Sequence, residues 1–275
     1  MQILSEMNEF LRISQAAARA AGEILISEMG KARISEKRPG DFVTHVDFRS
    51  QQCIQQIIHQ SFPDHEFIGE ESLFQDGSES ERGKIVSREA DYCWVVDPLD
   101  GTLNYIHQLH SFSISIGLKF RQQVIVGCVF DPVLNEMFVA TLGGGAFLNE
   151  KPIQVSRATA LSQALLVCSF SSRVTRDSDE LTRFINILCD GHASIRRLGS
   201  AALNLCYVAC GRLDGYWATS VQSWDVAAGS LILREAGGIL SSINGFEFDL
   251  NDPQLIAAAS PQLGREMASY LSIRD

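Results

Sequence analysis

A short acidic segment near the middle of the chain combines two carboxylates with a proline and a glycine; it reads Asp97-Pro98-Leu99-Asp100-Gly101-Thr102. The apolar residues 92–96 read as a strand that delivers Asp97 to the edge of a sheet. Pro98 keeps Asp97 out of the α region, and Gly101 allows the turn from which the next helix starts. Both carboxylates should then converge beside a helix N-terminus, whose free N–H groups favour a phosphate. Hard oxygen ligands with no His or Cys among them are typical of Mg²⁺ sites.

The simpler interpretation of this segment, taken alone, is a capped strand-to-helix turn. Three further acidic residues stand where strands or helices are expected to begin or end: Asp47, Glu70 and Asp225. Alone, Asp47 and Asp225 read as N-caps or first-turn acids, and Glu70 reads as a solvated loop residue. The hypothesis of a metal site therefore depends on whether the fold brings these carboxylates together.

The charge of the chain argues against several classes of partner. The 275 residues carry a net charge of −10 at pH 7. That balance disfavours a nucleic-acid surface or an anionic membrane surface, and no apolar run reaches the ~18 residues of a membrane-spanning helix. An acidic enzyme with an anionic substrate needs a cation in its site, and a divalent ion held by carboxylates would supply it.

The cysteines and the N-terminal residues indicate the cellular compartment of the protein. The ten N-terminal residues contain no continuous apolar h-region, so we expect no signal peptide. The seven cysteines are an odd number and are scattered singly through apolar segments. This pattern predicts reduced thiols in a cytoplasmic protein.

The hydrophobic pattern predicts an α+β N-terminal lobe over residues 1–156 and an α/β C-terminal lobe over residues 157–275. In the first lobe it predicts helices over 8–29 and after Asp47, a polar loop or hairpin over 71–89, and antiparallel strands over 112–119, 124–130 and 136–141. In the C-terminal lobe it predicts strands over 164–169, near 216 and over 239–242, with helices over 178–188, after 199, after 224 and from 261.

These segments together resemble the inositol monophosphatase family, within the larger group of lithium-sensitive, metal-dependent phosphatases. The resemblance spans nearly the whole chain in the right order, and its two long motifs are specific. Residues 94–104 are similar to the family's first motif, and residues 224–229, continued by 234–238, are similar to its other long motif. Shorter matches are Asp41-x-Val43-Thr44 with Asp47, Gly69-Glu70-Glu71, residues 127–156, and Arg197-x-Gly199-Ser200-Ala201-Ala202.

The resemblance implies a layered α-β-α-β-α sugar-phosphatase sandwich with two fused lobes, and a site for two Mg²⁺ ions or three. The ligands of the first ion would be Glu70, Asp97 and the carbonyl of Leu99. Those of the other ion would be Asp97, Asp100 and Asp225. Glu70 would also help to hold a weaker third ion.

The resemblance also implies the roles of residues around the metals. Thr102 with Asp47 would orient and deprotonate the attacking water, and the backbone N–H groups of Gly101 and Thr102 would hold the phosphate. Ser171 and Ala201 match positions that line the substrate pocket. The implied reaction is in-line hydrolysis of a phosphomonoester by metal-activated water, without a protein nucleophile.

The resemblance leaves the substrate open. Inositol-specific members carry a Glu seven residues before the Asp of the C-terminal motif, and this chain has Ala218 there. The leading candidate substrate is an inositol phosphate or a related sugar or polyol phosphate. Histidinol phosphate, fructose bisphosphate, NADP and 3′-phosphoadenosine nucleotides are the alternatives. Some bacterial relatives act on transcription complexes, so a regulatory binding protein of the same fold is the other class of function. The family also implies a homodimer.

Overall fold

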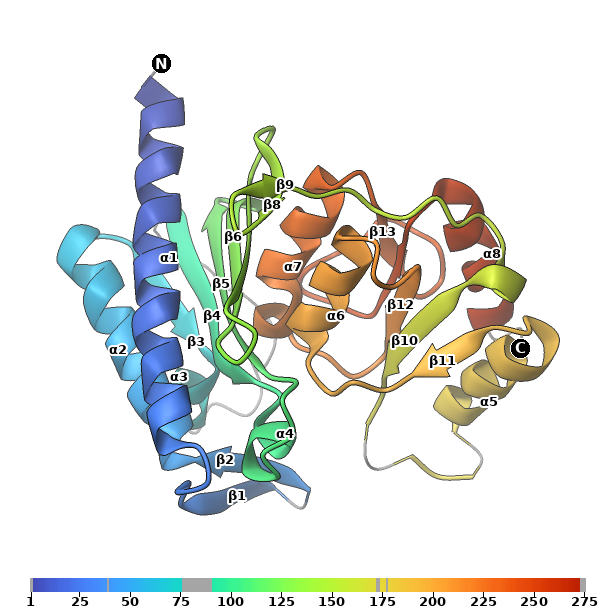
Figure 1. Cartoon of the computed structure of the whole chain (residues 1–275), viewed down its shortest axis with the longest axis horizontal. Coiled ribbons are helices and arrows are strands. Elements are labelled where there is room, and N and C mark those ends of the chain that lie inside the picture. Colours follow the sequence, from blue (N-terminus) through green and yellow to red (C-terminus); the bar gives the residue numbers. More distant parts are fainter. Residues whose placement is uncertain (1, 39, 76–90, 172–173, 177, 273–275) are drawn as a thin grey trace.

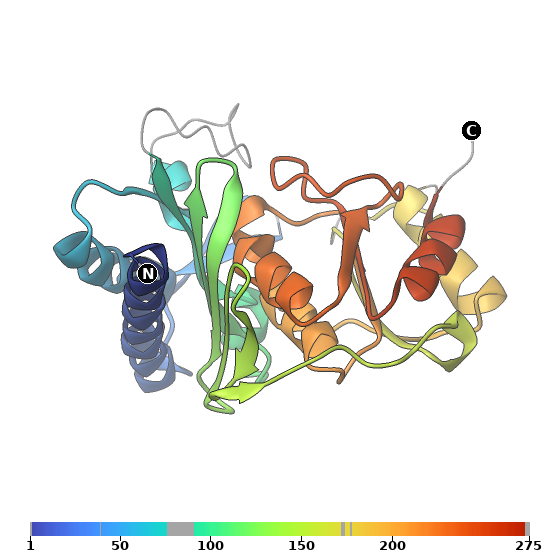
Figure 2. The same cartoon turned by 90° about the horizontal axis from the view of Figure 1, so that it is seen from above.

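The chain folds into five layers in which helices alternate with two β-sheets (Figures 1 and 2). The computed structural model describes residues 2–38, 40–75, 91–171, 174–176 and 178–272. One outer layer contains α1 (Gln2–Glu28) and α2 (His45–Ser61), the middle layer contains α6 (Ala201–Ala209) and α7 (Ser223–Glu235), and the other outer layer contains α5 (Asp179–Ile185) and α8 (Pro261–Leu271). This order confirms the expected α-β-α-β-α sandwich.

A seven-stranded sheet separates the first two helix layers. In spatial order its strands are β3 (Glu66–Gly69), β4 (Tyr92–Asp100), β5 (Ser113–Phe120), β6 (Gln123–Asp131), β7 (Glu136–Thr141), β8 (Gly145–Leu148) and β9 (Lys151–Pro152). β3 is parallel to β4, and every later pair is antiparallel. The expected strands β5 to β7 are confirmed. β8 and β9 were not predicted, because the three glycines at 143–145 indicate a break in the strand pattern.

A five-stranded sheet lies on the other side of α6 and α7, with the order β11-β10-β12-β14-β13. Its strands are β10 (Leu165–Ser169), β11 (Ser194–Arg196), β12 (Gly215–Ala218), β13 (Ile239–Ser242) and β14 (Leu255–Ala258). β10 is parallel to β11 and β12, whereas β14 is antiparallel to β12 and β13. β11 and β14 were not predicted, because β11 has only three residues and the four residues of β14 are all apolar, which gives no alternating pattern.

Several helix boundaries differ from the expectation. α1 begins at Gln2 rather than near residue 8. α2 begins at His45, two residues before Asp47, because Thr44 and Asp47 form a capping box. The expected loop after residue 70 is wrong for α3 (Glu70–Gln75), and residues 76–90 lie outside the described residues. The remaining elements are β1 (Ile34–Arg38), β2 (Asp41–Thr44), α4 (Thr102–Ile106), a 3₁₀ turn (Leu161–Gln163) and a π-helical turn (Asn186–Asp190) that continues α5.

Packing glycines let α7 approach both of its neighbours closely. A Cβ added at Gly127 of β6 would lie 2.5 Å from the carbonyl oxygen of Ala228 in α7. A Cβ at Gly229 of α7 would lie 2.7 Å from Leu205 of α6. These contacts leave no room for larger side chains, so they fix the distance of α7 from the sheet and from α6.

Two expectations from composition can be compared with the structure. All seven cysteines are free, which agrees with the expectation of reduced thiols. None of the helices in the described part of the chain combines the length and the apolarity that crossing a bilayer requires.

An aromatic cluster packs Phe10 of α1 against the segment that follows α2 and against β4. The His65 ring stacks on Phe62 at 4.9 Å and on Tyr92 at 4.6 Å between ring centroids. The indole Nε1–H of Trp94 donates to His65 Nδ1 at 3.1 Å, so this nitrogen must be unprotonated. Burial lowers the pKa of His65, and the charge of Asp64 opposes that shift.

His65 should make the fold less stable in mild acid. Its pKa is lower in the folded protein than the ~6.5 of an unfolded chain, so the unfolded chain binds the proton more readily. Its contribution is therefore complete above pH ~6.5 and is lost as the pH falls from there through the lowered folded pKa. Urea unfolding of the wild type and of His65→Asn at several pH values below 7 should show a smaller pH dependence in the variant. The exposed His192→Asn is the matched control, and equal pH dependence in wild type and His65→Asn would refute the assignment.

Candidate active site

A bulge in β4 turns two aspartates toward the same face of the sheet. Residues three apart on a regular strand face opposite sides. Here Asp97 pairs with Ser115 and Asp100 pairs with Ser113, so three steps along β4 match two along β5. The extra residue is a β-bulge, and Pro98, which has no N–H for the ladder, lies within it. Both carboxylates consequently point toward α6 and α7.

Asp225 and Asp47 occupy equivalent places at the starts of two helices. Each is the third residue of its helix and accepts the backbone N–H of the residue before the helix. These bonds are Gln222 N to Asp225 Oδ2 at 2.7 Å and Thr44 N to Asp47 Oδ2 at 2.9 Å. Such bonds leave the other carboxylate oxygen directed away from the helix. Asp47 Oδ1 accepts the Thr102 hydroxyl at 3.2 Å, which joins α2 to α4.

Glu70 reaches the site from the end of β3. It begins α3, and its Oε1 accepts from Lys37 Nζ at 2.8 Å. The same ammonium donates to Oε1 of the buried Glu71 at 2.6 Å. Gln51 accepts the N–H of Glu71 at 2.9 Å, and a Cβ at Gly69 would clash with the Gln51 side-chain amide. This packing explains why glycine precedes the two glutamates.

Burial and mutual repulsion disfavour ionisation of the clustered carboxyls. Burial raises the pKa of Asp97 well above its usual range, and the charges of Glu70, Asp100 and Asp225 add to the shift. Burial likewise raises the pKa of Asp225, while a hydrogen bond to the Asp97 side chain opposes the change. Burial raises the pKa of Asp100 to about 6 and that of Asp47 to about 6. Negative charge in this place therefore needs a compensating cation.

The donors suit a hard divalent cation, although some are engaged elsewhere. Carboxylates and the Leu99 carbonyl offer only oxygen, as Mg²⁺ prefers. No three His, Cys, Asp or Glu side chains among the described residues already stand in a geometry that would hold an ion. Glu70 pairs with Lys37, and Asp100 accepts hydrogen bonds from the start of α6. A divalent ion would offset the burial of these charges and the repulsion between them, so the residues fit the group by charge and donor type.

The turn after the bulge presents backbone groups beside the carboxylates. Gly101 has φ +95, a conformation that favours glycine. The Thr102 N–H is the first of α4 and has no acceptor within the helix. The Thr102 hydroxyl lies 3.1 Å from the Leu99 carbonyl oxygen as well as near Asp47. The N–H groups of Gly101 and Thr102, which are expected to hold the phosphate, thus lie in the turn that joins β4 to α4.

The positions expected to line the substrate pocket come from the start of α6 and from the ends of β10 and β12. Ser171 follows β10 and is partly buried. Ala201 opens α6, and its N–H donates to Asp100 Oδ1 at 3.1 Å. Ala218 is fully buried at the end of β12, within the hydrophobic core between the two sheets. Its methyl group therefore packs in the core.

Three residues at or beside this site had no predicted role, although Asn104 and Ser200 stand within segments that resemble the family's motifs. Lys37 pairs with Glu70, Ser200 donates to Asp100, and Asn104 donates to the Leu198 carbonyl at 2.7 Å. Ser200 carried a signal, because a serine directly before an expected helix is a favoured N-cap. The position of Lys37, 33 residues before its partner, had none.

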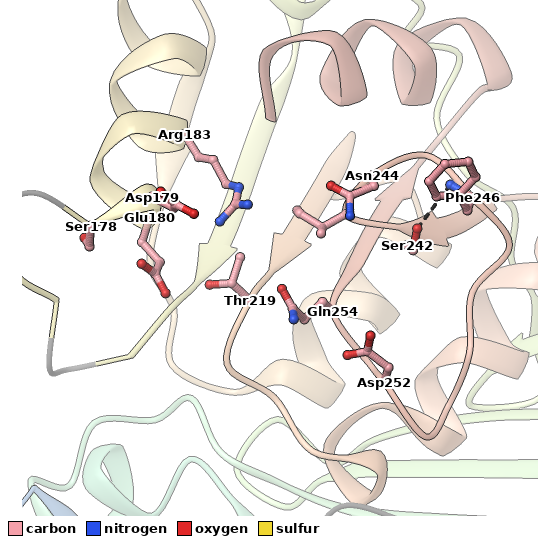
Figure 3. A pocket seen from close by; sticks show the side chains of 11 residues that line it. Ser178, Asp179, Glu180, Arg183, Thr219, Ser242, Asn244, Phe246, Asp252 and Gln254 are labelled. Atoms are coloured by element: carbon pink, nitrogen blue, oxygen red, sulfur yellow. Dashed lines mark hydrogen bonds between the residues drawn. The ribbon is translucent and has the colours of Figure 1, made fainter. Parts of the chain in front are cut away.

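A cavity of about 810 Å³ lies elsewhere, between α5 and the turns around β13 and β14. Figure 3 shows Arg183, Thr219 and Gln254 directed into it. It contains none of the clustered carboxylates, so its size does not identify it as a reaction site. The chemistry points to the clustered carboxylates around Asp97 instead.

Comparison with known proteins identifies the family of the chain. A model of the Inositol monophosphatase family matches residues 6–274. "Nus factor SuhB" of Pasteurella multocida is 39% identical over 268 residues, covering 96% of each chain. "Inositol-1-monophosphatase" of Synechocystis sp. is 39% identical over 270 residues, covering 98% of this chain and 90% of the relative. The solved inositol monophosphatase of Anabaena (Nostoc) sp. has a TM-score of 0.82 at 34% identity, covering 97% of this chain and 96% of its own. The chain belongs to the inositol monophosphatase family.

Proposed function

We propose that this protein is a Mg²⁺-dependent phosphatase that hydrolyses small phosphomonoesters. The observation that carries the proposal is the clustering of four carboxylates. Asp97 and Asp100 come from the end of β4, and they lie close to Asp225 at the start of α7 and to Glu70. Family membership supports the same reaction, since one relative is named as an inositol-1-monophosphatase.

The chain's own residues would divide the work as follows. Glu70, Asp97 and the Leu99 carbonyl would hold one Mg²⁺, and Asp97, Asp100 and Asp225 would hold another. Glu70 would also contribute to a weaker third site. When bound, the ions would lower the pKa of the attacking water and stabilise the charge that develops on the leaving oxygen.

Thr102 and Asp47 form the path for the proton of the attacking water. The Thr102 hydroxyl would accept a hydrogen bond from that water and direct its own proton toward Asp47 Oδ1, 3.2 Å away. Thr44 holds the other Asp47 oxygen through its N–H and its hydroxyl, at 2.9 and 2.6 Å. The N–H groups of Gly101 and Thr102 would fix the phosphate.

Family membership supports two further proposals, on substrate and assembly. An inositol, sugar or polyol phosphate is the leading substrate, with histidinol phosphate, fructose bisphosphate, NADP and 3′-phosphoadenosine nucleotides as alternatives. Ser171 and the start of α6 at Ala201 would border the organic part of the substrate. A homodimer is the assembly we propose, and analytical ultracentrifugation tests it.

One comparison favours an alternative function, that of a regulatory binding protein. The Pasteurella relative is named Nus factor SuhB, and its similarity extends along 96% of this chain. Purified protein that binds Mg²⁺ and phosphoesters but turns over no member of a broad phosphoester panel would favour this function over the phosphatase.

Removal of divalent cations should abolish turnover. Excess chelator should bring phosphoester hydrolysis to background, and added Mg²⁺ should restore it, because the carboxylates need a cation to ionise together. Mg²⁺ at a hundredfold excess over its Kd should also stabilise the fold by about 2.7 kcal/mol, which thermal unfolding measures. Full activity in chelator would exclude the metal hypothesis.

Asp97→Asn should lose more activity than Asp225→Asn, because Asp97 would bridge two ions and Asp225 would contact one. A charge 4 Å from a cation contributes about 4 kcal/mol per unit charge at an effective dielectric constant of 20. We therefore expect kcat/KM to differ between the variants by about a hundredfold or more.

Metal-free thermal unfolding supplies the control for these two variants. Each should be at least as stable as the metal-free wild type, because each relieves carboxylate repulsion. Asp131→Asn removes an equally buried aspartate of β6 outside the cluster and should keep its Mg²⁺ dependence. Wild-type kinetics for Asp97→Asn would refute the site.

Substrate use should be broad. The buried methyl group of Ala218 cannot hydrogen-bond a substrate hydroxyl, so one route to selectivity for inositol is absent. Such a contact is worth about 1–3 kcal/mol, or roughly ten- to a hundredfold in discrimination. The measurement is kcat/KM for inositol 1-phosphate, glycerol 2-phosphate, histidinol phosphate, fructose 1,6-bisphosphate and a nucleoside monophosphate. A preference for the inositol ester beyond about a thousandfold would show that another group replaces the missing Glu.

A further inference from the structure

Three donors at the start of α6 hold the Asp100 carboxylate: one side-chain hydroxyl and two backbone N–H groups. Asp100 Oδ2 accepts the Ser200 hydroxyl at 2.5 Å and the N–H of Ala202 at 2.8 Å. Oδ1 accepts the N–H of Ala201 at 3.1 Å. The Ser113 hydroxyl approaches Oδ2 at 3.4 Å, and all of these groups are buried. A carboxylate from the seven-stranded sheet thus accepts hydrogen bonds from the N-terminus of a helix in the next layer.

The Ser200 hydroxyl has no bonding capacity to spare. It donates its single proton to Asp100, and its oxygen accepts the N–H of Leu203 at 3.2 Å as the N-cap of α6. The Ser113 hydroxyl lies 3.2 Å from the same oxygen and must act there as donor. One buried hydroxyl therefore fixes both the start of α6 and the orientation of the carboxylate.

Two neighbouring residues hold Ser200 in place. The Asn104 side-chain amide donates to the carbonyls of Leu198 and Ser111, both at 2.7 Å. Gly199 has φ +90, and a Cβ there would lie 2.5 Å from the Asn104 amide nitrogen. The backbone at Ser200 is therefore locked against α4, and its hydroxyl has a fixed direction.

These bonds distinguish the two oxygens of Asp100. A carboxylate offers about four lone-pair directions. Two strong bonds occupy Oδ2, while Oδ1 carries one and keeps a free lone pair. A fixed hydrogen-bond partner on a metal ligand sets its orientation and its affinity for the ion.

We propose that Ser200 is a positioning residue that turns Asp100 so that Oδ1 faces the metal site, an inference that rests on the proposed function. Ser200 reaches the metal site only through Asp100. Its loss should therefore weaken Mg²⁺ binding in addition to the loss of stability that removal of the α6 N-cap brings.

Another serine N-cap in the chain provides a matched control. Ser260 caps α8, accepts the N–H of Leu263 at 3.2 Å, and donates to the Ala158 carbonyl at 2.8 Å. It has the same capping geometry as Ser200, but its hydroxyl donates to a backbone carbonyl far from the carboxylates. Ser260→Ala therefore removes a cap and leaves the metal ligands unchanged.

The experiment is calorimetric titration of metal-free protein with Mg²⁺, paired with thermal unfolding. Ser200→Ala should raise the Mg²⁺ Kd about tenfold or more, whereas Ser260→Ala should lower the Tm and keep the wild-type Kd. Ser200→Gly also removes the hydroxyl, but glycine is a tolerated N-cap, so this variant tests the Kd if the alanine variant unfolds.

The possible results separate the two proposals. A wild-type Kd in Ser200→Ala and Ser200→Gly would overturn the positioning role and leave Ser200 as a helix cap only. Wild-type protein that binds no Mg²⁺ would overturn the proposed metal site and this inference with it. A raised Kd in both Ser200 variants, with an unchanged Kd in Ser260→Ala, supports the proposal.

Discussion

The structure depends on one constraint: several carboxylates of like charge must be held close together at a largely buried site. Burial raises the pKa values of Asp97, Asp100 and Asp225, and the charges of Glu70 and Asp100 add to the shifts of Asp97 and Asp225. Each carboxylate is nevertheless held by donors that favour its charged form: Leu99 N–H for Asp97, the start of α6 for Asp100, and Gln222 N–H for Asp225. The fold thus opposes repulsion with oriented backbone dipoles and leaves the remaining charge for a cation.

The site forms only where separate layers meet. Asp97 and Asp100 come from the bulge in β4, Asp225 from the first turn of α7, and Glu70 from the end of β3. Asp100 also accepts N–H groups at the start of α6. The contact that docks the middle helix layer on the seven-stranded sheet therefore also orients the Asp100 carboxylate. Displacing α6 relative to β4 would misplace Asp100 and remove the hydrogen bonds that stabilise its charge.

The parts of the site that the sequence could predict lie at the ends of periodic segments. Asp97 and Asp225 stand where an apolar strand or helix meets polar residues, and that local pattern marks them. The bulge could not be predicted, because it depends on how β4 pairs with β5, although Pro98 is compatible with a bulge. Lys37 and Glu71 form a buried pair across 34 positions of sequence, and no local pattern encodes such a contact. The short strands β11 and β14 were missed for a related reason, since their pairing comes from neighbouring strands.

The far end of α7 is as constrained as the end that bears Asp225. Glu235 accepts the N–H groups of Gly143 and Gly145, both at 2.8 Å, and so ties α7 to the turn before β8. Gly127 lets the middle of the helix rest against β6. With the helix fixed at its middle and its far end, Asp225 has little freedom along the helix axis. The C-terminal motif therefore combines one carboxylate with residues whose function is to hold that carboxylate at a set distance from Asp97.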